Sequence, residues 1–293
     1  MMDAVITYVN GDDPLWKQDY ETHAGAPILV KRFRDWGTLP YLFRGLEKNM
    51  PFIDRVFLVV SRESQVPEWV NREKVQVVLH KEFIPEKFLP TFNPSVIEMF
   101  LHRIPGLGEK YLYFNDDEFP VREVKESSLF PGGRPTKQMI WHLNSVGQFL
   151  SLCRDSCNLA RKAAGKKSSP FYLRPQLSVT PFLRSACEEA FQACESEILA
   201  SMSTLRKAGN FNQYFFSDYM FFKKIAATKR ISHMQFSMAI VSSDDIVKFL
   251  EKPMSDFVSI TDVDMPNMRY LYSKERLLDG FNFLFNYKSS YEI

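Results

Sequence analysis

The sequence lacks the short motifs that identify several common enzyme classes. It contains no GxxxxGKS/T phosphate-binding loop, no GxGxxG dinucleotide fingerprint and no GxSxG nucleophile elbow. The sequence therefore does not indicate a P-loop nucleotide-binding protein, a dinucleotide-binding protein or a hydrolase of the nucleophile-elbow type. Any catalytic chemistry must therefore come from residues outside these motifs.

Cysteine is scarce, and its spacing does not indicate a metal site. The four cysteines lie between residues 153 and 194, with no CxxC pair and no histidine among them. Structural zinc sites use closely spaced cysteine and histidine ligands, so we expect none here. Cys153 and Cys157 are four residues apart, and we predict that they share one buried face of a helix as small apolar residues.

Long apolar runs and an excess of charge are also missing. The apolar run at 56–60 is far shorter than the roughly 20 residues of a membrane span. The opening MMDAVITYVNG has no basic segment typical of a signal peptide, so we expect a cytoplasmic protein. Lys+Arg 37 against Asp+Glu 35 gives a net charge of +2, which gives no indication of nucleic acid as a partner.

What the first half of the sequence does have is an alternation of strand and helix patterns. Helical spacing of apolar residues covers 38–49 and the segment after Asn93. Between and around these helices lie runs typical of buried strands, at 4–9, 55–61, 73–79 and 111–114. Strands that alternate with helices predict an α/β fold with a mostly parallel sheet.

Polar side chains follow the predicted strands directly. Asn10, Gly11 and Asp12 come after the first strand, and Asn115-Asp116-Asp117 comes after the fourth. In parallel α/β sheets, ligands bind beyond the carboxyl ends of the strands. These two segments are therefore the first candidates for a binding site.

Asp116 and Asp117 form the strongest candidate metal site. Two adjacent carboxylates at the ligand edge of a sheet suit a hard divalent cation, which takes oxygen ligands and bridges substrate phosphates. The alternative is a loop with solvated acids. Asp262 follows the strand-like run 257–260 and is positioned to complete the metal shell, with a helix cap as its alternative role.

Arginine and histidine supply two further groups of candidates. Arg32, Arg34 and Asp35 precede the helix at 38–49, where a guanidinium and a helix N-terminus together suit a phosphate. Their alternative role is a surface ion pair. His102, with Arg103 beside it, stays open as a catalytic candidate because the acidic pair follows soon after it.

The second half of the chain is predicted to be mainly helical. The segment 161–174 has five basic residues and no acid, which fits either a solvated loop or a lip for an anionic donor or acceptor. We expect a single domain, 1–293. Its predicted parts are an α/β core, a helical part and a return to the core, at 1–144, 145–250 and 251–293.

Several blocks of the sequence resemble the Stealth family of capsular and exopolysaccharide phosphotransferases, which includes animal N-acetylglucosamine-1-phosphotransferase. The opening DAVITYVNGDDP is similar to the first block of that family. The long second block includes RFRDWGTLPYLFRGLEKNMPFIDRVFLVV and ends in LHRIPGLGEKYLYFNDDEF, and the closing NYKSSYE resembles the family's terminal block. The resemblance is dense over 3–119 and patchy afterwards.

The resemblance implies transfer of a sugar 1-phosphate from a nucleotide sugar to a hydroxyl of a growing glycan, with release of a nucleoside monophosphate. It implies a Rossmann-like nucleotide-sugar transferase core with a helical insertion, and a divalent metal, Mg²⁺ or alternatively Mn²⁺. The implied partners are a UDP-sugar and a polysaccharide or oligosaccharide acceptor, with peripheral association at the inner face of the membrane left open. The matching site residues are Asn10, Gly11, Asp12, Arg32, Arg34, Asp35, Asn115, Asp116 and Asp117.

The later blocks match less closely. The family's third block has a histidine, a candidate general base, where this chain has Gln176 or Leu177, and neither can accept a proton at neutral pH. His102 or one carboxylate of the acidic pair would then have to serve. The segment LRKAGNFNQY resembles the family's arginine-plus-asparagine block, which implies site roles for three residues, Arg206, Asn210 and Asn212.

Two other functions remain compatible with the same residues. A metal-dependent glycosyltransferase would use the same donor but attack the anomeric carbon, and it would release a nucleoside diphosphate. A non-catalytic glycan- or nucleotide-binding subunit would explain the missing histidine, because it would bind donor without turnover.

Overall fold

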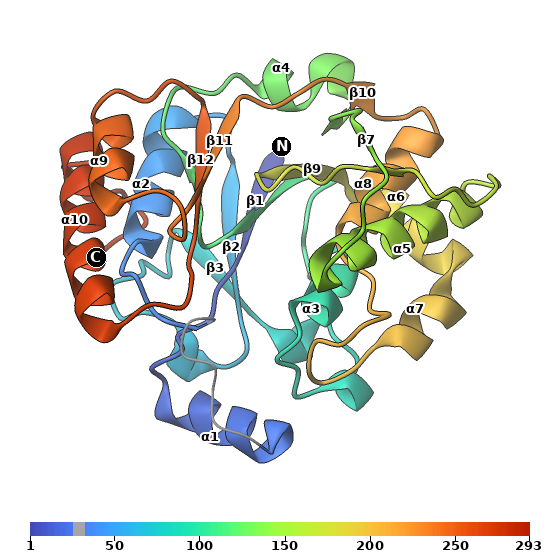
Figure 1. Ribbon diagram of the computed structural model, residues 1–293, viewed down its shortest axis with the longest axis horizontal. Helices are drawn as coiled ribbons and strands as arrows, with labels where there is room; N and C mark the ends of the chain where they lie inside the picture. The colour runs from blue at the N-terminus through green and yellow to red at the C-terminus, as the bar shows by residue number, and fades with distance from the viewer. Residues whose placement is uncertain (26–32) are drawn as a thin grey trace.

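The protein is built around a five-stranded sheet (Figure 1), described here from a computed structural model that covers residues 1–25 and 33–293. The strand order is β3-β2-β1-β4-β9, in which the first four strands are parallel and β9 is antiparallel to β4. The bounds are β1 (Met2–Thr7), β2 (Arg55–Val60), β3 (Val75–Leu79), β4 (Lys110–Asn115) and β9 (Thr180–Leu183). The predicted α/β class with a mostly parallel sheet is confirmed.

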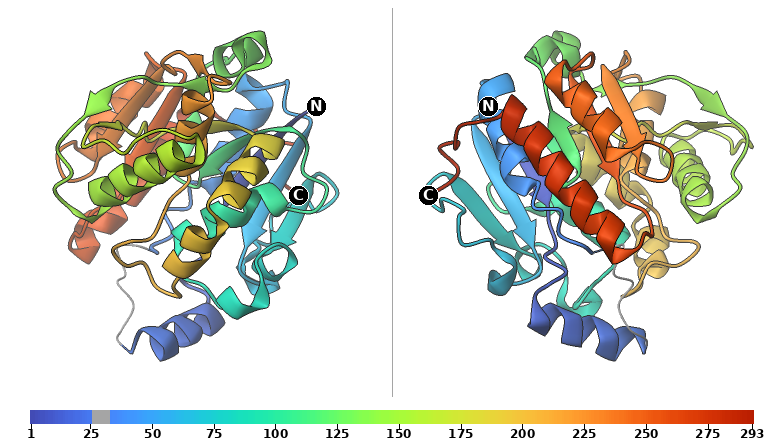
Figure 2. Two further views of the ribbon diagram at one scale, coloured as in Figure 1. Left: turned by 90° about the vertical axis from the view of Figure 1, so that its right-hand side faces the viewer. Right: turned by 60° about the vertical axis from the view of Figure 1, so that its left-hand side comes forward.

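Helices cover both faces of this sheet (Figure 2). Alternate residues of a strand point to opposite faces, so Ala4 and Ile6 of β1 pack in one core and Val5 packs in the other. The first face is covered by α2 (Leu39–Asn49), α9 (Ser243–Glu251) and α10 (Asn267–Leu284). The second is covered by α3 (Pro94–Phe100), α5 (Gln148–Ala163), α6 (Arg184–Ala193) and α8 (Tyr214–Phe222).

Smaller sheets extend this framework. A three-stranded sheet places β12 (Phe257–Thr261) between β11 (His233–Ser237) and β5 (Glu118–Pro120). Two-stranded pairs join β10 (Ala227–Thr228) to β6 (Thr136–Lys137), and β7 (Trp141–His142) to β8 (Tyr172–Leu173). The other α-helices in the described ranges are α1 (Pro14–Ala24), α4 (Glu126–Leu129) and α7 (Glu195–Ser201).

The second half of the chain is less uniform than its sequence pattern indicates. The helical pattern at 185–207 corresponds to two helices, α6 and α7, with Cys194 between them. Strand β9 lies within the segment predicted to be mainly helical, yet it joins the central sheet. Cys153 and Cys157 are buried on α5, as predicted. No helix in the described part of the chain combines the length and apolar character needed to cross a bilayer.

The strand order creates a topological switch point between β1 and β4. The chain runs outward from β1 through α2 to β2 and β3, then crosses back through α3 to β4 on the other side of β1. Helices α2 and α3 lie on opposite faces of the sheet, so their connections diverge at this point. In doubly wound folds the ligand crevice lies outside the carboxyl ends of the strands at such a point.

At the opposite, amino edge of the sheet, Asp3 ties three segments together. This fully buried carboxylate accepts hydrogen bonds from Arg55 Nε at 2.9 Å and Nη2 at 2.6 Å, and from the Gly108 amide at 2.7 Å. It thereby joins the starts of β1 and β2 to the turn that leads into β4. A buried carboxylate is stable only when such donors satisfy it.

We predict that Asp3→Ala lowers the free energy of unfolding by about 3 kcal/mol, because it leaves Arg55 and the Gly108 amide without their partner. Urea denaturation of both proteins measures the change. The matched control is Arg72→Ala, which removes an exposed ion pair with Glu63 and is expected to change the value by less than about 0.5 kcal/mol. An equal effect of both substitutions would contradict the role assigned to Asp3.

Candidate active site

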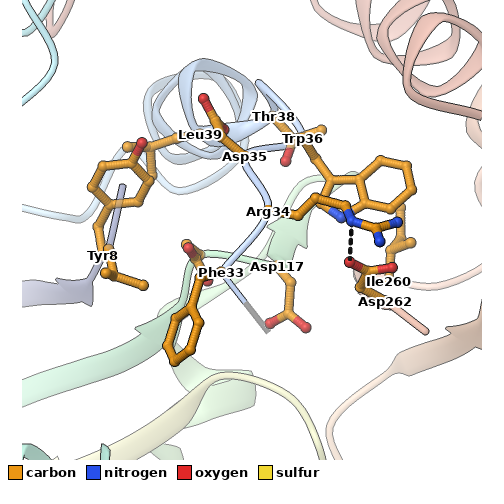
Figure 3. A pocket seen from close by; sticks show the side chains of 12 residues that line it. Tyr8, Phe33, Arg34, Asp35, Trp36, Thr38, Leu39, Asp117, Ile260 and Asp262 are labelled. Carbon is orange, nitrogen blue, oxygen red and sulfur yellow. Dashed lines mark ion pairs between the residues drawn. The ribbon is translucent and has the colours of Figure 1, made fainter. Parts of the chain in front are cut away.

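A pocket opens at the switch point, where the carboxyl ends of β1 and β4 meet the end of β12 (Figure 3). Four carboxyl groups and one guanidinium line it, together with aromatic and aliphatic side chains. The lining residues are Tyr8, Val9, Phe33, Arg34, Asp35, Trp36, Thr38, Leu39, Asp116, Asp117, Ile260 and Asp262. The structure therefore brings together Arg34, Asp35 and the three predicted metal ligands.

Asp116 and Asp117 occupy the tight turn between β4 and β5. Glu118 fastens this turn, because its carboxylate accepts from the Asn115 amide at 3.2 Å and from Asn115 Nδ2 at 3.3 Å. On the other side, the Asp117 carbonyl accepts from the Ile260 amide of β12 at 3.1 Å. The turn is thus held by both sheets, and Asn115 supports it without lining the pocket.

The described residues provide no cation that would stabilise the charged forms of the two aspartates. Burial, followed by repulsion from Asp117 and Asp35, raises the pKa of Asp116 to about 8. Burial also raises the pKa of Asp117 to about 6. Carboxyl groups with raised pKa values in a cleft are typical of functional sites, where a cation or a substrate supplies the missing partner.

Arg34 and Asp262 form the opposite wall of the pocket. Arg34 Nε lies 3.9 Å from Asp262 Oδ2, and the guanidinium stacks over the Tyr270 ring at 4.7 Å (Figure 3). Arg34 Nη1 and Asp262 Oδ2 are buried and make no hydrogen bond with the described residues. Burial raises the pKa of Asp262, and Arg34 partly opposes this shift. Both side chains therefore have unused polar atoms at the pocket.

The backbone between Arg34 and α2 is held from α10. The Asp35 carbonyl accepts from Tyr270 Oη and from Lys274 Nζ, both at 2.6 Å. Asp35 Oδ1 accepts from the Gly37 amide at 2.7 Å, while Thr38, the residue before α2, makes no side-chain capping bond. An uncapped helix N-terminus beside an arginine is an arrangement suited to an anion.

The loop after β1, residues 8–13, packs beside the pocket and is held by Gln65. Gln65 accepts from the Asn10 amide at 2.7 Å and donates to the Asn10 carbonyl at 3.0 Å. Gly11 lies so close to the next segment that a Cβ atom there would be 1.8 Å from the Phe33 carbonyl oxygen. Asp12 is exposed and pairs with Lys17. Asn10, Gly11 and Asp12 therefore lie beside the pocket without lining it.

His102 and Arg103 lie away from the pocket, at the amino end of β4. His102 is buried between the rings of Phe191 and Phe216, and its Nε2 lies 2.8 Å from a carboxylate oxygen of Glu188. Arg103 donates to the same carboxylate twice, at 3.0 Å. Burial lowers the pKa of His102 to about 4. The structure therefore gives both residues contacts with α6 and does not bring them to the acidic pair.

Asn210 and Arg206 lie in the loop before α8. Asn210 is buried, accepting from Asn93 Nδ2 at 3.1 Å and donating to the Ser201 carbonyl at 2.6 Å, which organises this loop. Arg206 is exposed. Its neighbour Leu205 packs on a cluster of Trp16, Tyr20 and Phe92 that also contacts Val9 and Phe33. The loop therefore borders the pocket, although neither Arg206 nor Asn210 lines it.

Other sequence candidates have different surroundings. Asn212 donates to Cys153 Sγ at 3.5 Å inside the second core. Gln176 donates to the Ile231 carbonyl at 2.8 Å, and Leu177 packs against the second core. Arg32 lies outside the described residues.

Sequence reasoning missed seven of the lining residues, among them Tyr8 and Trp36. It also missed Glu118 and Gln65, which hold the segments that carry the pocket's side chains. Tyr8 lies near the carboxyl end of the first predicted strand, so its place in the chain was a usable signal. The partners of Glu118 and Gln65 could not be found from spacing alone.

The pocket fits a divalent cation that is bound mainly through a substrate. In the described ranges, no three or more histidine, cysteine, aspartate or glutamate side chains form a preassembled metal-binding group. Mg²⁺ usually binds through one or two carboxylates together with water and substrate phosphates. The uncompensated charge of Asp116 and Asp117 and the unpartnered oxygen of Asp262 are the donors that such a site requires.

The fold and the pocket define a class of protein: a doubly wound α/β protein with an acidic, arginine-containing site at its switch point. Residues 32–138 match the family model described as Stealth protein CR2, conserved region 2. The chain is thus similar to the Stealth family over this region, and the resemblance predicted from its sequence blocks is confirmed for these residues.

Curated relatives agree with this assignment. The chain is 40% identical over 138 residues to the receptor polysaccharide phosphotransferase WefC of Streptococcus oralis, covering 44% of this chain and 41% of the relative. It is 40% identical over 143 residues to the capsular polysaccharide phosphotransferase CpsJ of Streptococcus thermophilus, covering 46% and 59%. The chain therefore spans about half the length of the curated relatives it matches.

One solved structure is similar to the chain at a low level. This is the galactosyltransferase LgtC in complex with donor and acceptor sugar analogues. The two superimpose with a TM-score of 0.47 and 11% sequence identity, over 96% of this chain and 95% of that one.

We predict that Gly11→Ala displaces the Phe33–Arg34 segment, because the new methyl group would overlap the Phe33 carbonyl. Overpacking of this kind costs about 1–3 kcal/mol, which urea denaturation measures. A crystal structure of the variant should show the Phe33 carbonyl moved by more than about 1 Å. Asp12→Ala, at the exposed neighbouring position, serves as the control and should leave both measurements unchanged. An undisplaced carbonyl in Gly11→Ala would show that this close contact does not hold the segment.

We predict that Asp116→Asn stabilises the metal-free protein at pH 8. A folded-state pKa of about 8, against an ordinary value of 3.8, means that folding binds a proton between these limits. Stability therefore falls as the pH rises from about 4 to about 8, and the neutral amide removes this loss. Thermal melts in EDTA across this range should show a gain in Tm that grows with pH. Asp279→Asn on the exposed surface is the control, and no gain at pH 8 would contradict the charge repulsion.

Proposed function

We propose that this chain transfers a sugar 1-phosphate from a nucleotide sugar to a hydroxyl of a capsular or extracellular polysaccharide, releasing a nucleoside monophosphate. The observation that carries the proposal is the pocket, which places Asp116 and Asp117 opposite Arg34 at the switch point of the sheet. The names of the relatives, which are polysaccharide phosphotransferases, support the same reaction class. Phosphoryl transfer depends mainly on positioning and on neutralising charge.

The proposed cofactor is a divalent metal ion, Mg²⁺ or Mn²⁺. Asp116 and Asp117 would hold it from one side, and Asp262 would face it from the opposite wall. Once bound, the ion would neutralise charge on the donor's phosphate oxygens. The carboxylates are well suited to this task, because the raised pKa values of Asp116 and Asp117 mean that no group among the described residues stabilises their charged forms.

Arg34 and the start of α2 are proposed to hold the donor phosphates. Arg34 keeps one buried nitrogen free of hydrogen bonds, and the stacking on Tyr270 fixes its guanidinium beside the pocket. The uncapped amides at Thr38 and Leu39 lie on the same side. Arg206, exposed on the bordering loop, is proposed as an additional cation at the rim.

The acceptor's proton is proposed to pass to one carboxylate of the acidic pair. His102 faces α6, and Gln176 stands in the region where the family has a histidine. Asp116 and Asp117 both line the pocket, and the one whose oxygen is not taken up by the metal ion would accept the proton. The donor is proposed to be a UDP-sugar. Nucleotide sugars are cytoplasmic metabolites, so the reaction is placed on the cytoplasmic side.

The test is nucleotide analysis after the full chain is incubated with UDP-N-acetylglucosamine and related donors, Mg²⁺ and a set of glycan acceptors. We expect release of nucleoside monophosphate, loss of release in EDTA and its return with Mg²⁺. Asp117→Asn and Arg34→Gln are each expected to lower the rate at least about 100-fold, because each removes charge stabilisation from the reacting phosphate. Asp279→Asn, an exposed aspartate on α10, should react at the wild-type rate.

Two outcomes would replace the proposal. Release of nucleoside diphosphate would move the chain among the glycosyltransferases, because the bond cleaved would then be the one at the anomeric carbon. Donor binding without any turnover, unchanged in Asp117→Asn, would identify a non-catalytic binding subunit.

A further inference from the structure

The paired strands β7 and β8 and the start of α5 lie on one side of the molecule (Figure 2, left), and they carry an exposed apolar surface. We call it the β7–β8 surface. Its members are large apolar side chains that are between 39% and 81% exposed: Met139, Ile140, Trp141, Leu143, Val146, Phe149 and Phe171. It begins one residue after the region that matches the family model and lines no part of the acidic pocket.

Contacts within the described residues join the segments that carry these side chains. Strand β7 pairs with β8, and the Ile140 carbonyl accepts from the Arg174 amide at 2.7 Å. Tyr172 Oη donates to the Asn144 carbonyl at 2.6 Å, which holds the loop from β7 to α5 against β8. Arg161 lies over the Trp141 ring at 5.3 Å and donates to the Phe171 carbonyl at 3.2 Å.

The surface lies in the most basic part of the chain. Residues 127–187 contain nine lysine or arginine residues and one acid, Asp155, which gives this stretch a net charge of +8 against +2 for the whole chain. Asp155 is already paired with Arg154. Lys166, Lys167 and Arg174 are exposed and form no ion pair in the described ranges. Lys137 and Lys162 are also paired, with Asp218 and Glu197, so the charge available to an external anion is that of the exposed residues without an ion pair in the described ranges.

We propose that the β7–β8 surface docks the protein on an anionic lipid bilayer. Contiguous exposed apolar residues mark interaction sites, and apolar side chains with an interfacial tryptophan and flanking lysines and arginines match the interface of an anionic membrane. The apolar side chains enter the headgroup region while the basic residues contact the lipid phosphates. The proposal does not depend on the transfer reaction, because binding can be measured without substrates.

Other partners fit these side chains less well. A glycan platform combines aromatic rings with hydrogen-bonding side chains, whereas Met139, Ile140, Leu143 and Val146 are aliphatic. A symmetric contact with a second copy would place like charges opposite one another. Exposed apolar residues also occur on α10, at Met268 and Leu271, but the charges of α9 and α10 largely balance there, since Arg276 pairs with Asp244 and Lys248 with Asp245.

The experiment is vesicle flotation of the full chain with phosphatidylcholine vesicles that contain or lack phosphatidylglycerol. We expect binding to the anionic vesicles only, weakened by salt. Lys166→Gln/Lys167→Gln should weaken binding roughly 25-fold, at about fivefold per charge. Leu143→Ser/Val146→Ser should weaken it roughly tenfold or more through the lost apolar contact. The matched control, Met268→Ser/Leu271→Ser on α10, should bind as the wild type does.

Three results would overturn the proposal. The first is equal binding to both vesicle types, and the second is binding that neither the double lysine variant nor the Leu143→Ser/Val146→Ser variant changes. The third is no binding to anionic vesicles at low salt. A concentration-dependent dimer without vesicles, lost in Leu143→Ser/Val146→Ser, would instead assign the surface to a second copy. Circular dichroism and thermal melts of each variant establish that it is folded, and the replaced side chains are exposed enough for this to be expected.

Discussion

The pocket depends on one electrostatic constraint: two adjacent carboxyl groups are held where the described residues provide no cation to stabilise their charged forms. The turn that carries Asp116 and Asp117 cannot relax away from this position, because Glu118 fixes one end and β12 fixes the other. Keeping like charges close and partly desolvated costs free energy. Burial of apolar side chains in the two cores on the faces of the sheet offsets this cost.

The opposite wall of the pocket also has an incompletely paired charged group, here the pair of Arg34 and Asp262. Arg34 faces Asp262 without closing on it, since a separation of 3.9 Å is longer than a hydrogen bond. The stacking of Arg34 on Tyr270 and the hold of Lys274 on the Asp35 carbonyl keep this wall in place from α10. A negatively charged ligand that brings its own cation would therefore find partners on both walls without a large rearrangement of the protein.

How far the sequence predicts this structure depends on the range of the contacts involved. Asp116, Asp117 and Asp262 could be placed because each follows a strand, and strand periodicity is local. His102 was expected near them because it is close in sequence, yet it precedes β4 and so lies at the other edge of the sheet. Tyr270 and Lys274 could not be assigned, because only tertiary packing brings α10 to residues 34–36.

The position of β12 in the small sheet has a consequence for the order in which the molecule is made. β12 pairs with β11 on one side and β5 on the other, and it carries Asp262 at its end. A nascent chain would therefore emerge from the ribosome with Arg34 and its acidic turn complete well before Asp262 and α10. Synthesis of β12 and α10 closes the pocket, so a chain released before them would carry Asp116 and Asp117 without the side of the pocket that Asp262 forms.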